Sequence, residues 1–334
     1  MSEIYAITGG NGFLGRALRA ELNDRGESFR LLSRSEPREF ADAFQRLDLT
    51  TASTEEVASA LKSVRVLFHL AGLVSFDPAD GPAMMRIHVE GTRRLLAGAL
   101  TAGVERIVLL STSGTVGVGV EPTFRADDQS PYAMEHALRW PYYSSKIFQE
   151  KLCLAWARQH DRELIALRPS LAVGPGDHDL SSTGEILKFL RGEMPALPAG
   201  GISLVDVRDI ASACYTAARI ELPGLRGNPR SYPLGAENMT IRELAEELGR
   251  ISGAALPRLQ TSATVARGAA RAWAELGRPG RRIGPLRDLD PVAVEMAQYF
   301  WYCDASRARG ELDWRPRPIH ETLTDTVRFL QNMG

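Results

Sequence analysis

Two side chains that together could move a proton lie four residues apart in the segment Tyr142-Tyr143-Ser144-Ser145-Lys146. The run that continues to Arg158 has a helical pattern, which would place Tyr142 and Lys146 on one face, one turn apart. A phenol with its ordinary pKa of about 10 is a poor acid–base catalyst at neutral pH, but a nearby ammonium favours the phenolate and lowers that pKa. The pair therefore predicts an acid–base catalyst.

A glycine loop near the start of the chain predicts a dinucleotide cofactor. The pattern is Thr8-Gly9-x-x-Gly12-x-x-Gly15, and it lies between a short apolar run, Glu3–Thr8, and a helical pattern, Arg16–Arg25. In such a loop the first glycine permits a tight turn, the second lets the backbone approach a pyrophosphate, and the third allows the helix to pack on the strand. The helix N-terminus then faces the anion.

The end of the second expected strand, Ser28–Leu32, indicates which dinucleotide is bound. An acidic residue there would bind the ribose of NAD, but the chain has Arg34 and no carboxylate before Glu36. Arg34 suits a 2′-phosphate, so NADP(H) is favoured over NAD(H); a solvated arginine is the alternative. Asp48 and Leu49 suit the adenine edge, and capping of the third helix is the alternative for Asp48.

The pattern of elements predicts an α/β fold, a Rossmann-type doubly wound parallel sheet with a smaller C-terminal substrate-binding lobe. We expect a dinucleotide-binding domain over residues 1–169, to which 204–235 returns, and a substrate-binding lobe made mainly of 170–203 and 236–334. A long helix is expected over Pro82–Ala102 and a shorter one over Asn238–Ser252. Further strands are expected at Val64–Leu70, Arg106–Leu110 and Glu163–Arg168.

Composition narrows the class of protein. The net charge is −1, which is unsuited to nucleic-acid binding. No apolar run reaches about 18 residues and the chain enters a strand at once, so we expect neither a membrane span nor a signal peptide. The three cysteines, Cys153, Cys214 and Cys303, have no metal or redox spacing and are expected to be buried thiols. We expect a cytoplasmic enzyme without a metal.

The order of the motifs resembles that of the extended short-chain dehydrogenase/reductase superfamily, which includes the NAD-dependent epimerase/dehydratase family. The resemblance covers essentially the whole chain. It rests on Thr8–Gly15, His69–Gly72, Val89–Thr92, Ser111–Thr115, Tyr142–Lys146, Arg168–Ser170, Gly174–Asp177, Val205–Ala211 and Asp304–Pro316.

The resemblance implies a division of catalytic work. Tyr142 would be the general acid in reduction or the base in oxidation, and Lys146 would hold the nicotinamide ribose and lower the pKa of the phenol. Ser113 would polarise the substrate oxygen, on which negative charge develops. The cofactor would also contact Gly9, Gly12, Phe13, Leu14, Gly15, Leu70, Ala71, Gly72, Ser111, Pro169 and Ser170.

His88 departs from the family, where asparagine is common. Its ring could join a proton relay, but a hydrogen-bonded structural histidine is the favoured interpretation.

Two further segments indicate the branch. Dehydratases carry an Asp-Glu pair where this chain has Gly114 and Thr115, so dehydration is not expected. Leu171 and Val173 replace the Asn and Tyr of many sugar-nucleotide epimerases, which suits an uncharged substrate. Similarity to the dihydroflavonol-reductase and 3β-hydroxysteroid-dehydrogenase branch implies hydride transfer between the cofactor and a ketone, aldehyde or secondary alcohol of a hydrophobic small molecule. A sugar-nucleotide epimerase is the alternative, followed by a non-catalytic sensor or scaffold.

Three expectations concern surfaces. Thr264–Arg287 is rich in arginine and is either a substrate lid, a membrane-surface contact or a solvated face. Tyr299–Tyr302 either lines the substrate pocket or packs the second lobe. The resemblance implies a homodimer that pairs the helices Pro82–Ala102 and Tyr142–Arg158.

Overall fold

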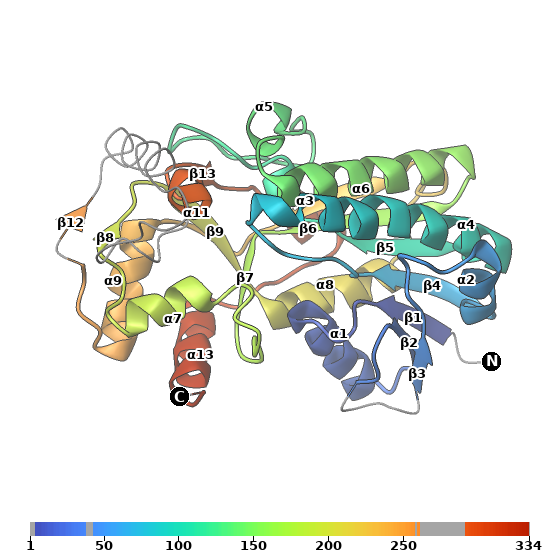
Figure 1. The fold of residues 1–334 in the computed structure, drawn as a ribbon, viewed down its shortest axis with the longest axis horizontal. Coiled ribbons are helices and arrows are strands. Elements are labelled where there is room, and N and C mark those ends of the chain that lie inside the picture. Colours follow the sequence, from blue (N-terminus) through green and yellow to red (C-terminus); the bar gives the residue numbers. More distant parts are fainter. Residues whose placement is uncertain (1–3, 38–42, 258, 261–290, 334) are drawn as a thin grey trace.

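The computed structural model describes residues 4–37, 43–257, 259–260 and 291–333, which form a parallel sheet covered on both faces by helices, with a smaller lobe beside it (Figure 1). The sheet has seven strands in the order β10-β6-β5-β4-β1-β2-β3, and all neighbours pair in parallel. The order from β3 to β6 is that of a doubly wound fold, so the predicted fold class is confirmed. The strands are β1 (Ile4–Thr8), β2 (Phe29–Ser33), β3 (Phe44–Arg46), β4 (Val64–His69), β5 (Arg106–Leu110), β6 (Glu163–Pro169) and β10 (Arg230–Leu234).

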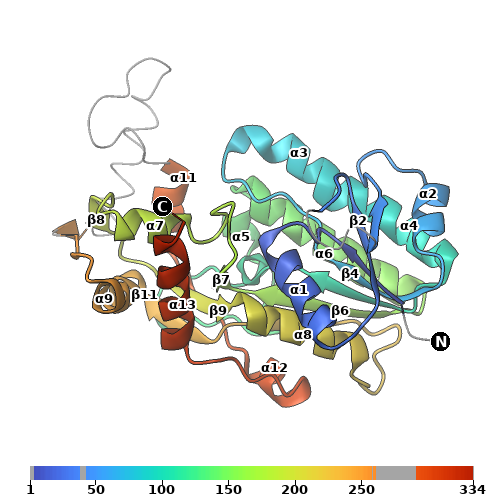
Figure 2. The same ribbon diagram turned by 90° about the horizontal axis from the view of Figure 1, so that it is seen from below.

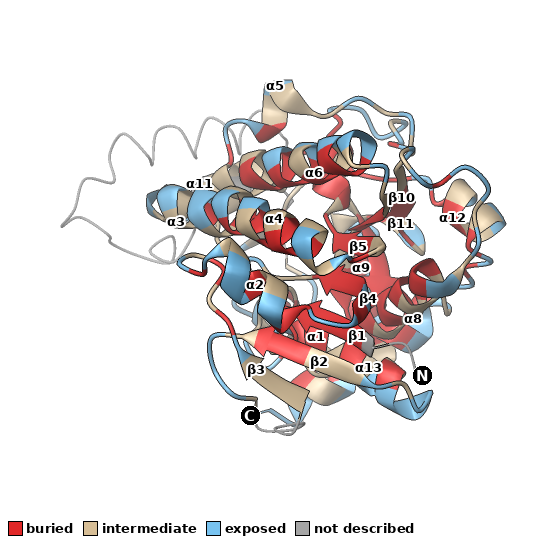
Figure 3. Cartoon of the chain, turned by 90° about the vertical axis from the view of Figure 1, so that its right-hand side faces the viewer, coloured by how far each residue is buried: buried red, intermediate tan, exposed pale blue. Residues whose placement is uncertain are grey.

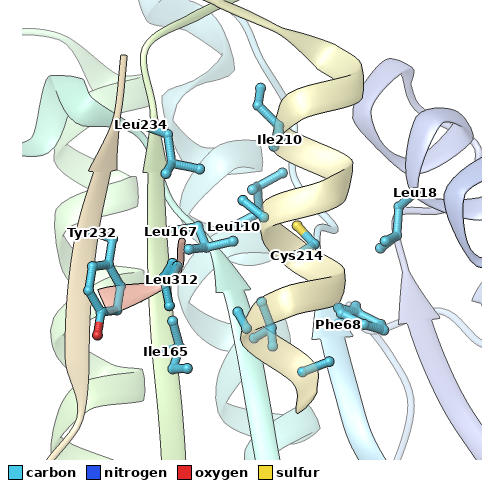
Figure 4. Close-up of a cluster of buried hydrophobic side chains, with 14 of the residues drawn as sticks. Leu18, Phe68, Leu110, Ile165, Leu167, Ile210, Cys214, Tyr232, Leu234 and Leu312 are labelled. Carbon is cyan, nitrogen blue, oxygen red and sulfur yellow. The ribbon is translucent and has the colours of Figure 1, made fainter. Parts of the chain in front are cut away.

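Helices on both faces bury the sheet. Helices α1 (Phe13–Asp24) and α8 (Val207–Arg219) pack together on one face, and α2 (Thr54–Ala60), α4 (Thr92–Ala102) and α6 (Pro141–Gln159) form the other layer. Figure 3 shows the buried strands between these layers. Side chains alternate along each strand, so Leu109 of β5 packs toward α4 and α6 while Leu110 packs toward α8. Figure 4 shows Leu110 and Leu167 beside Ile210 and Cys214 of α8.

The five predicted strands of this sheet are present, each within one residue of its expected ends, whereas β3 and β10 were not predicted. Strand β3 has only three residues, Phe-Gln-Arg, and no alternating pattern. Strand β10 contains Pro233, which cannot donate a ladder hydrogen bond. This strand is at the edge of the sheet and pairs only with β6, a position that tolerates proline.

Two predicted helices differ from the structure. The region Pro82–Ala102 contains α3 (Gly81–Met85), a π-helical turn (Arg86–Gly91) and then α4. A π turn inserts a single residue, which hydrophobic periodicity does not reveal; His88 lies in this turn and is fully buried. The predicted helix Asn238–Ser252 begins only at Ile241, because Glu237–Thr240 form a strand.

A second lobe continues from the carboxyl end of β6. Strand β9 (Gly201–Asp206) pairs with β7 (Leu171–Val173), β11 (Glu237–Thr240) and β13 (Phe300–Trp301). Helices α7 (Gly184–Leu190), α9 (Ile241–Ser252) and α13 (Ile319–Gln331) pack around a separate apolar cluster (Figure 2). Since β9 leads directly into α8, the chain passes from the lobe back to the main sheet at Val207.

The remaining elements are short. They are α5 (Met134–Ala137), α11 (Pro291–Met296), α12 (Ser306–Glu311), the pair β8 (Ala196–Leu197) and β12 (Leu259–Gln260), and the 3-10 turns Pro78–Asp80 and Ser113–Thr115. Within the described ranges, no helix has the length and apolar character needed to cross a bilayer.

Candidate active site

Most of the predicted site residues follow the carboxyl ends of neighbouring strands. The glycine loop follows β1, Arg34 follows β2, Ala71 follows β4, and Ser113 follows β5. In a parallel sheet these ends lie at one edge. Helix α6 begins at this edge and packs on the Ser113–Thr115 turn, so it brings Tyr142 and Lys146 to the same place.

The glycine loop is packed tightly against the β4 loop. Gly9 has a φ of 74°, and a Cβ there would lie 2.6 Å from the backbone nitrogen of Ala71. A Cβ on Gly15 would lie 2.3 Å from the carbonyl oxygen of Gly9. Packing within the protein therefore requires glycine at both positions. Phe13 is buried in the core, and Leu14 is partly buried against it.

Gly12 is different, because no packing within the described protein requires it to be glycine. Its φ is −76°, and a Cβ there would meet only the Gly9 carbonyl oxygen, at 3.6 Å. Gly12 is also the N-cap of α1, and no side chain caps this helix. Open space above free N–H groups at a helix N-terminus fits the pyrophosphate of a dinucleotide.

Arg34 and Asp48 lie near each other at the ends of β2 and β3. Arg34 is exposed. Partial burial acts to raise the pKa of Asp48, but hydrogen bonds from Thr50 and the charge of Arg34 outweigh it and leave this pKa below its ordinary value. Asp48 does not cap α2, the helix that follows it in the chain. Ser53 caps this helix, in a capping box with Glu56, so that alternative was wrong. Leu49 is buried in the core.

Two polar residues that the sequence did not single out brace the glycine loop. The Asn11 side chain donates to the carbonyl of Ser35, at 3.0 Å. Arg16 donates to the Asn11 carbonyl, at 2.6 Å, and to the Gly176 carbonyl of the second lobe, at 2.9 Å. No local sequence signal indicates these contacts, because they join residues up to 160 positions apart.

Tyr142 and Lys146 lie in the first two turns of α6, but the expected effect of the lysine on the phenol is absent. Burial raises the pKa of Tyr142 to about 12. The Lys146 ammonium instead donates to the carbonyl of Leu110, at 2.8 Å, and to Oε1 of Gln149. Burial lowers the pKa of Lys146 to about 8. The prediction that Lys146 lowers the pKa of Tyr142 is therefore wrong for this structure, since the ammonium is held by other acceptors.

The hydroxyl of Ser111, which is predicted to contact the cofactor, is bonded within the protein. Its hydroxyl donates to Oε2 of the buried Glu150, at 2.5 Å. Oε1 of Glu150 accepts from Arg168, at 2.6 Å, and from Tyr132, at 3.0 Å. Ser111 therefore helps to join α6 to the sheet, and its hydroxyl is already used. Ser113 is also buried and begins the 3-10 turn that α6 covers.

The other predicted cofactor residues fit more closely. Ser170 follows Pro169 at the end of β6, and its buried hydroxyl has no hydrogen-bond partner among the described residues. Leu70 and Ala71 donate their backbone N–H groups to Thr8, at 3.1 and 3.3 Å. The free Ser170 hydroxyl and the open space at Gly12 both match a nicotinamide dinucleotide lying across these strand ends.

His88 joins the loop after β4 to α6. Its Nε2 accepts from the backbone N–H of Leu73, at 3.0 Å, so its Nδ1 carries the proton and donates to Ser145 Oγ, at 2.8 Å. Ser145 in turn donates to the Tyr142 carbonyl, at 2.8 Å. Burial lowers the pKa of His88 to about 2, so the ring is neutral. A Cβ on Gly72 would lie 2.8 Å from His88 Nε2, so Gly72 provides the space for this ring.

The aromatic segment Tyr299–Tyr302 packs the second lobe against the start of α6. Trp301 stacks on Tyr143 with ring centroids 4.9 Å apart, and Tyr143 contacts the ring of Tyr142, 5.0 Å away. Trp301 and Tyr299 are buried. The segment thus packs the lobe one ring away from Tyr142. The arginine-rich segment Thr264–Arg287 lies outside the described residues.

Comparison with known proteins agrees with this geometry. The profile of the NAD dependent epimerase/dehydratase family matches residues 5–226. A protein of Synechocystis sp., provisionally named a dihydroflavonol 4-reductase, is 32% identical over 100% of this chain and 96% of its own length. A 3-beta-hydroxysteroid dehydrogenase of Mycolicibacterium neoaurum is 25% identical over 93% of this chain and 86% of its own. The crystal structure of gox2253 aligns with a TM-score of 0.83 and 29% identity, covering 100% of this chain and 99% of that one.

The matched residues include the glycine loop, all the strands from β1 to β6 and the start of α6 that carries Tyr142 and Lys146. The resemblance found in the sequence is therefore confirmed. This chain belongs to the NAD-dependent epimerase/dehydratase family of extended short-chain dehydrogenases/reductases.

Proposed function

We propose that this protein is an NADP(H)-dependent oxidoreductase that transfers a hydride between the cofactor and a ketone, aldehyde or secondary alcohol of a fairly hydrophobic small molecule. The observation that carries the proposal is the start of α6, which carries Tyr142 and Lys146 and packs on the turn that begins at Ser113, at the strand edge that the glycine loop also borders. When bound, the nicotinamide supplies the hydride.

The side chains supply the proton and hold the substrate oxygen. Tyr142 donates its phenolic proton to the carbonyl oxygen, and Ser113 donates a hydrogen bond to the same atom. Burial raises the pKa of Tyr142 to about 12, so the phenol is protonated at neutral pH and can act as the proton donor when a carbonyl is reduced. The Lys146 ammonium has three N–H donors. Two of them are hydrogen-bonded to protein acceptors, so one remains for a ribose hydroxyl.

The cofactor preference rests on the end of β2. Arg34 is exposed there, and no carboxylate occupies the position that binds the ribose of NAD. A guanidinium suits the 2′-phosphate of NADP(H) through charge-assisted hydrogen bonds.

The substrate class rests on what surrounds Tyr142. A Cβ on Gly114 would lie 2.1 Å from the Tyr143 ring, so the acidic side chain that a dehydratase carries at this position would have no room. Phe76 and Tyr143 lie against Tyr142, with centroids 6.2 and 5.0 Å away, so aromatic rings lie beside the phenol. The names of two relatives, a dihydroflavonol reductase and a hydroxysteroid dehydrogenase, point the same way.

The first test is the near-ultraviolet absorbance of NADPH, then NADH, mixed with the protein and a panel of hydrophobic ketones and aldehydes. The proposal expects loss of NADPH absorbance, and Tyr142→Phe should abolish this loss while NADPH still binds. Tight cofactor binding without net oxidation would instead favour the epimerase, tested next with sugar nucleotides. If Tyr142→Phe changes no measurable property, the protein is a sensor or scaffold.

We also propose a homodimer formed through the layer of α3, α4 and α6. Phe148 of α6 is 40% exposed and Met85 of α3 is 37% exposed, so both large apolar side chains are available for a contact between protomers. The mass in solution from light scattering should be twice that of one chain. In Phe148→Glu it should fall to the mass of one chain. A monomeric wild-type protein would contradict the proposal.

A further inference from the structure

The hydrogen-bond acceptors that the Lys146 ammonium reaches are neutral groups. Lys146 is 5% exposed, and among the described residues its nitrogen donates to two acceptors, the Leu110 carbonyl and Oε1 of Gln149. Gln149 is fully buried and lies one turn further along α6. A buried ammonium without a hydrogen-bonded acceptor would be costly. Gln149 is therefore the side chain whose oxygen accepts a hydrogen bond from this ammonium.

The orientation of the Gln149 amide is set by residues outside α6. Its Nε2 donates to Thr92 Oγ1, at 3.0 Å, and lies 3.2 Å from Nε2 of His69. His69 is itself held between Thr92 Oγ1 and Thr8 Oγ1, both at 2.8 Å. The amide nitrogen thus faces acceptors from β4 and α4, which leaves the amide oxygen facing Lys146. The opposite orientation would place two N–H groups against an ammonium.

Among the described residues, the other ionisable side chains near Lys146 do not accept a hydrogen bond from its ammonium. Burial, together with the charge of Lys146, lowers the pKa of His69 to about 3 and that of His88 to about 2, so both are neutral. Burial raises the pKa of Cys153 to about 12, so its thiol is protonated. Glu150 is on the same helix, but its oxygens accept from Arg168, Tyr132 and Ser111. Tyr142 stays protonated through its own burial.

We propose that Gln149 is a positioning residue that keeps the Lys146 ammonium charged and directed toward the strand edge, and that Thr92 and His69 fix the Gln149 amide for this purpose. The inference rests on the proposed function, because it gives Lys146 its catalytic importance. It goes beyond that function by extending the machinery to three buried residues that touch neither substrate nor cofactor.

The test measures the pKa of Lys146 directly and does not depend on turnover. The chain has only four lysines, Lys62, Lys146, Lys151 and Lys188, so selective 13C labelling of the lysine ε-carbon should give four resolved NMR signals. The signal that disappears in Lys146→Arg identifies Lys146. In Gln149→Leu we expect its pKa to fall by about one to two units, since a hydrogen bond to a charged group is lost. In Gln149→Glu the pKa should rise instead, because a carboxylate replaces the amide. This second variant keeps the test decisive if Gln149→Leu fails to fold.

Two threonines provide a matched pair. Thr92→Val removes the acceptor of the Gln149 amide. It should lower the Lys146 pKa, as Gln149→Leu does, but by a smaller amount. Thr326→Val removes a buried hydroxyl of α13, which donates to Thr322, and should leave the Lys146 signal unchanged. An unchanged Lys146 pKa in both Gln149 variants would overturn the inference.

The pH profile of NADPH oxidation separates this inference from the proposed function. If the protein is a reductase, the alkaline fall in its rate should move with the Lys146 pKa in each variant. If no carbonyl compound is reduced although the pKa moves, the proposed function fails and the positioning inference stands. If reduction proceeds with the same pH profile in wild type and Gln149→Leu, the function stands and the positioning inference fails.

Discussion

Lys146 of α6 and Arg168 of β6, the strand beneath this helix, are two buried cations whose surroundings are opposite. Arg168 is 4% exposed and Lys146 is 5% exposed. Burial acts to lower the pKa of Arg168, but the charge and hydrogen bonds of Glu150 outweigh it and raise this pKa. Lys146 has only the neutral oxygens of Leu110 and Gln149 as direct partners, and its pKa falls to about 8.

We interpret Arg168 as a structural cation and, under the proposed function, Lys146 as a catalytic one. A paired, permanently charged guanidinium fixes α6 on the sheet at every physiological pH. An ammonium without a direct counter-ion keeps an open donor and titrates near neutral pH, as groups at functional sites often do. The four predictions below test this contrast.

The largest effect is expected from Arg168→Met, which leaves Glu150 as an uncompensated buried charge. We expect the free energy of unfolding to fall by about 3–5 kcal/mol. Urea unfolding followed by circular dichroism would measure the loss. The double variant Arg168→Met/Glu150→Leu removes both charges and should regain much of it. An unfolding free energy in Arg168→Met equal to that of wild type would show that the pair is not structural.

Lys146→Met should reduce turnover strongly and stability only slightly, the reverse of what we expect for Arg168→Met. We expect the rate of NADPH oxidation to fall by roughly 10²- to 10⁴-fold, as for the loss of a group that supports acid–base catalysis. The free energy of unfolding should change by less than about 1 kcal/mol, since removal of the buried charge offsets the lost hydrogen bonds. Single-turnover kinetics and urea unfolding on the same preparation measure both quantities. A large loss of stability with normal turnover would reverse our assignment of the two cations.

The rate of reduction should depend on pH through Lys146. With a folded pKa of about 8, Lys146 is charged below this pH and loses its proton above it. The rate should therefore be level below about pH 7 and fall up to tenfold per unit above pH 8. His69 and His88, with pKa values lowered to about 3 and 2, should contribute nothing between pH 6 and 10. An acidic fall near pH 6 would mean that a histidine is involved after all.

Arg34 extends the comparison to an exposed cation. Arg34→Ala should weaken NADPH binding by about tenfold and leave NADH binding unchanged, because a charge-assisted bond to the 2′-phosphate is lost. Solvent screens this pair, so the effect should shrink at high salt. Fluorescence titration with both cofactors measures it, and Arg242→Ala, in the exposed part of α9, is the matched control. Equal loss of affinity for NADH would count against a 2′-phosphate contact.

Local patterns predicted the family and the fold better than the long-range contacts of individual residues. The glycine loop and the pair Tyr142 and Lys146 are contiguous motifs whose function depends on short spacings. The expected pKa of Tyr142 was wrong because it assumed that the ammonium faces the phenol. Lys146 instead meets Leu110, 36 residues earlier in the chain. Ser111 was predicted to contact the cofactor. Its hydrogen bond to Glu150 could not be predicted in the same way, because the two residues are 39 positions apart in the sequence.

The sequence by itself determined the strand–helix alternation, the glycine loop after the first strand and the helix that carries Tyr142 and Lys146, because these depend on periodicity and spacing within short segments. Only the tertiary structure decided the edge strand β10, the π turn at His88 and the partners of Lys146 and Arg168. These features depend on which distant side chains meet in the buried interior. There the cost of an unpaired polar group, rather than any local preference, selects the arrangement.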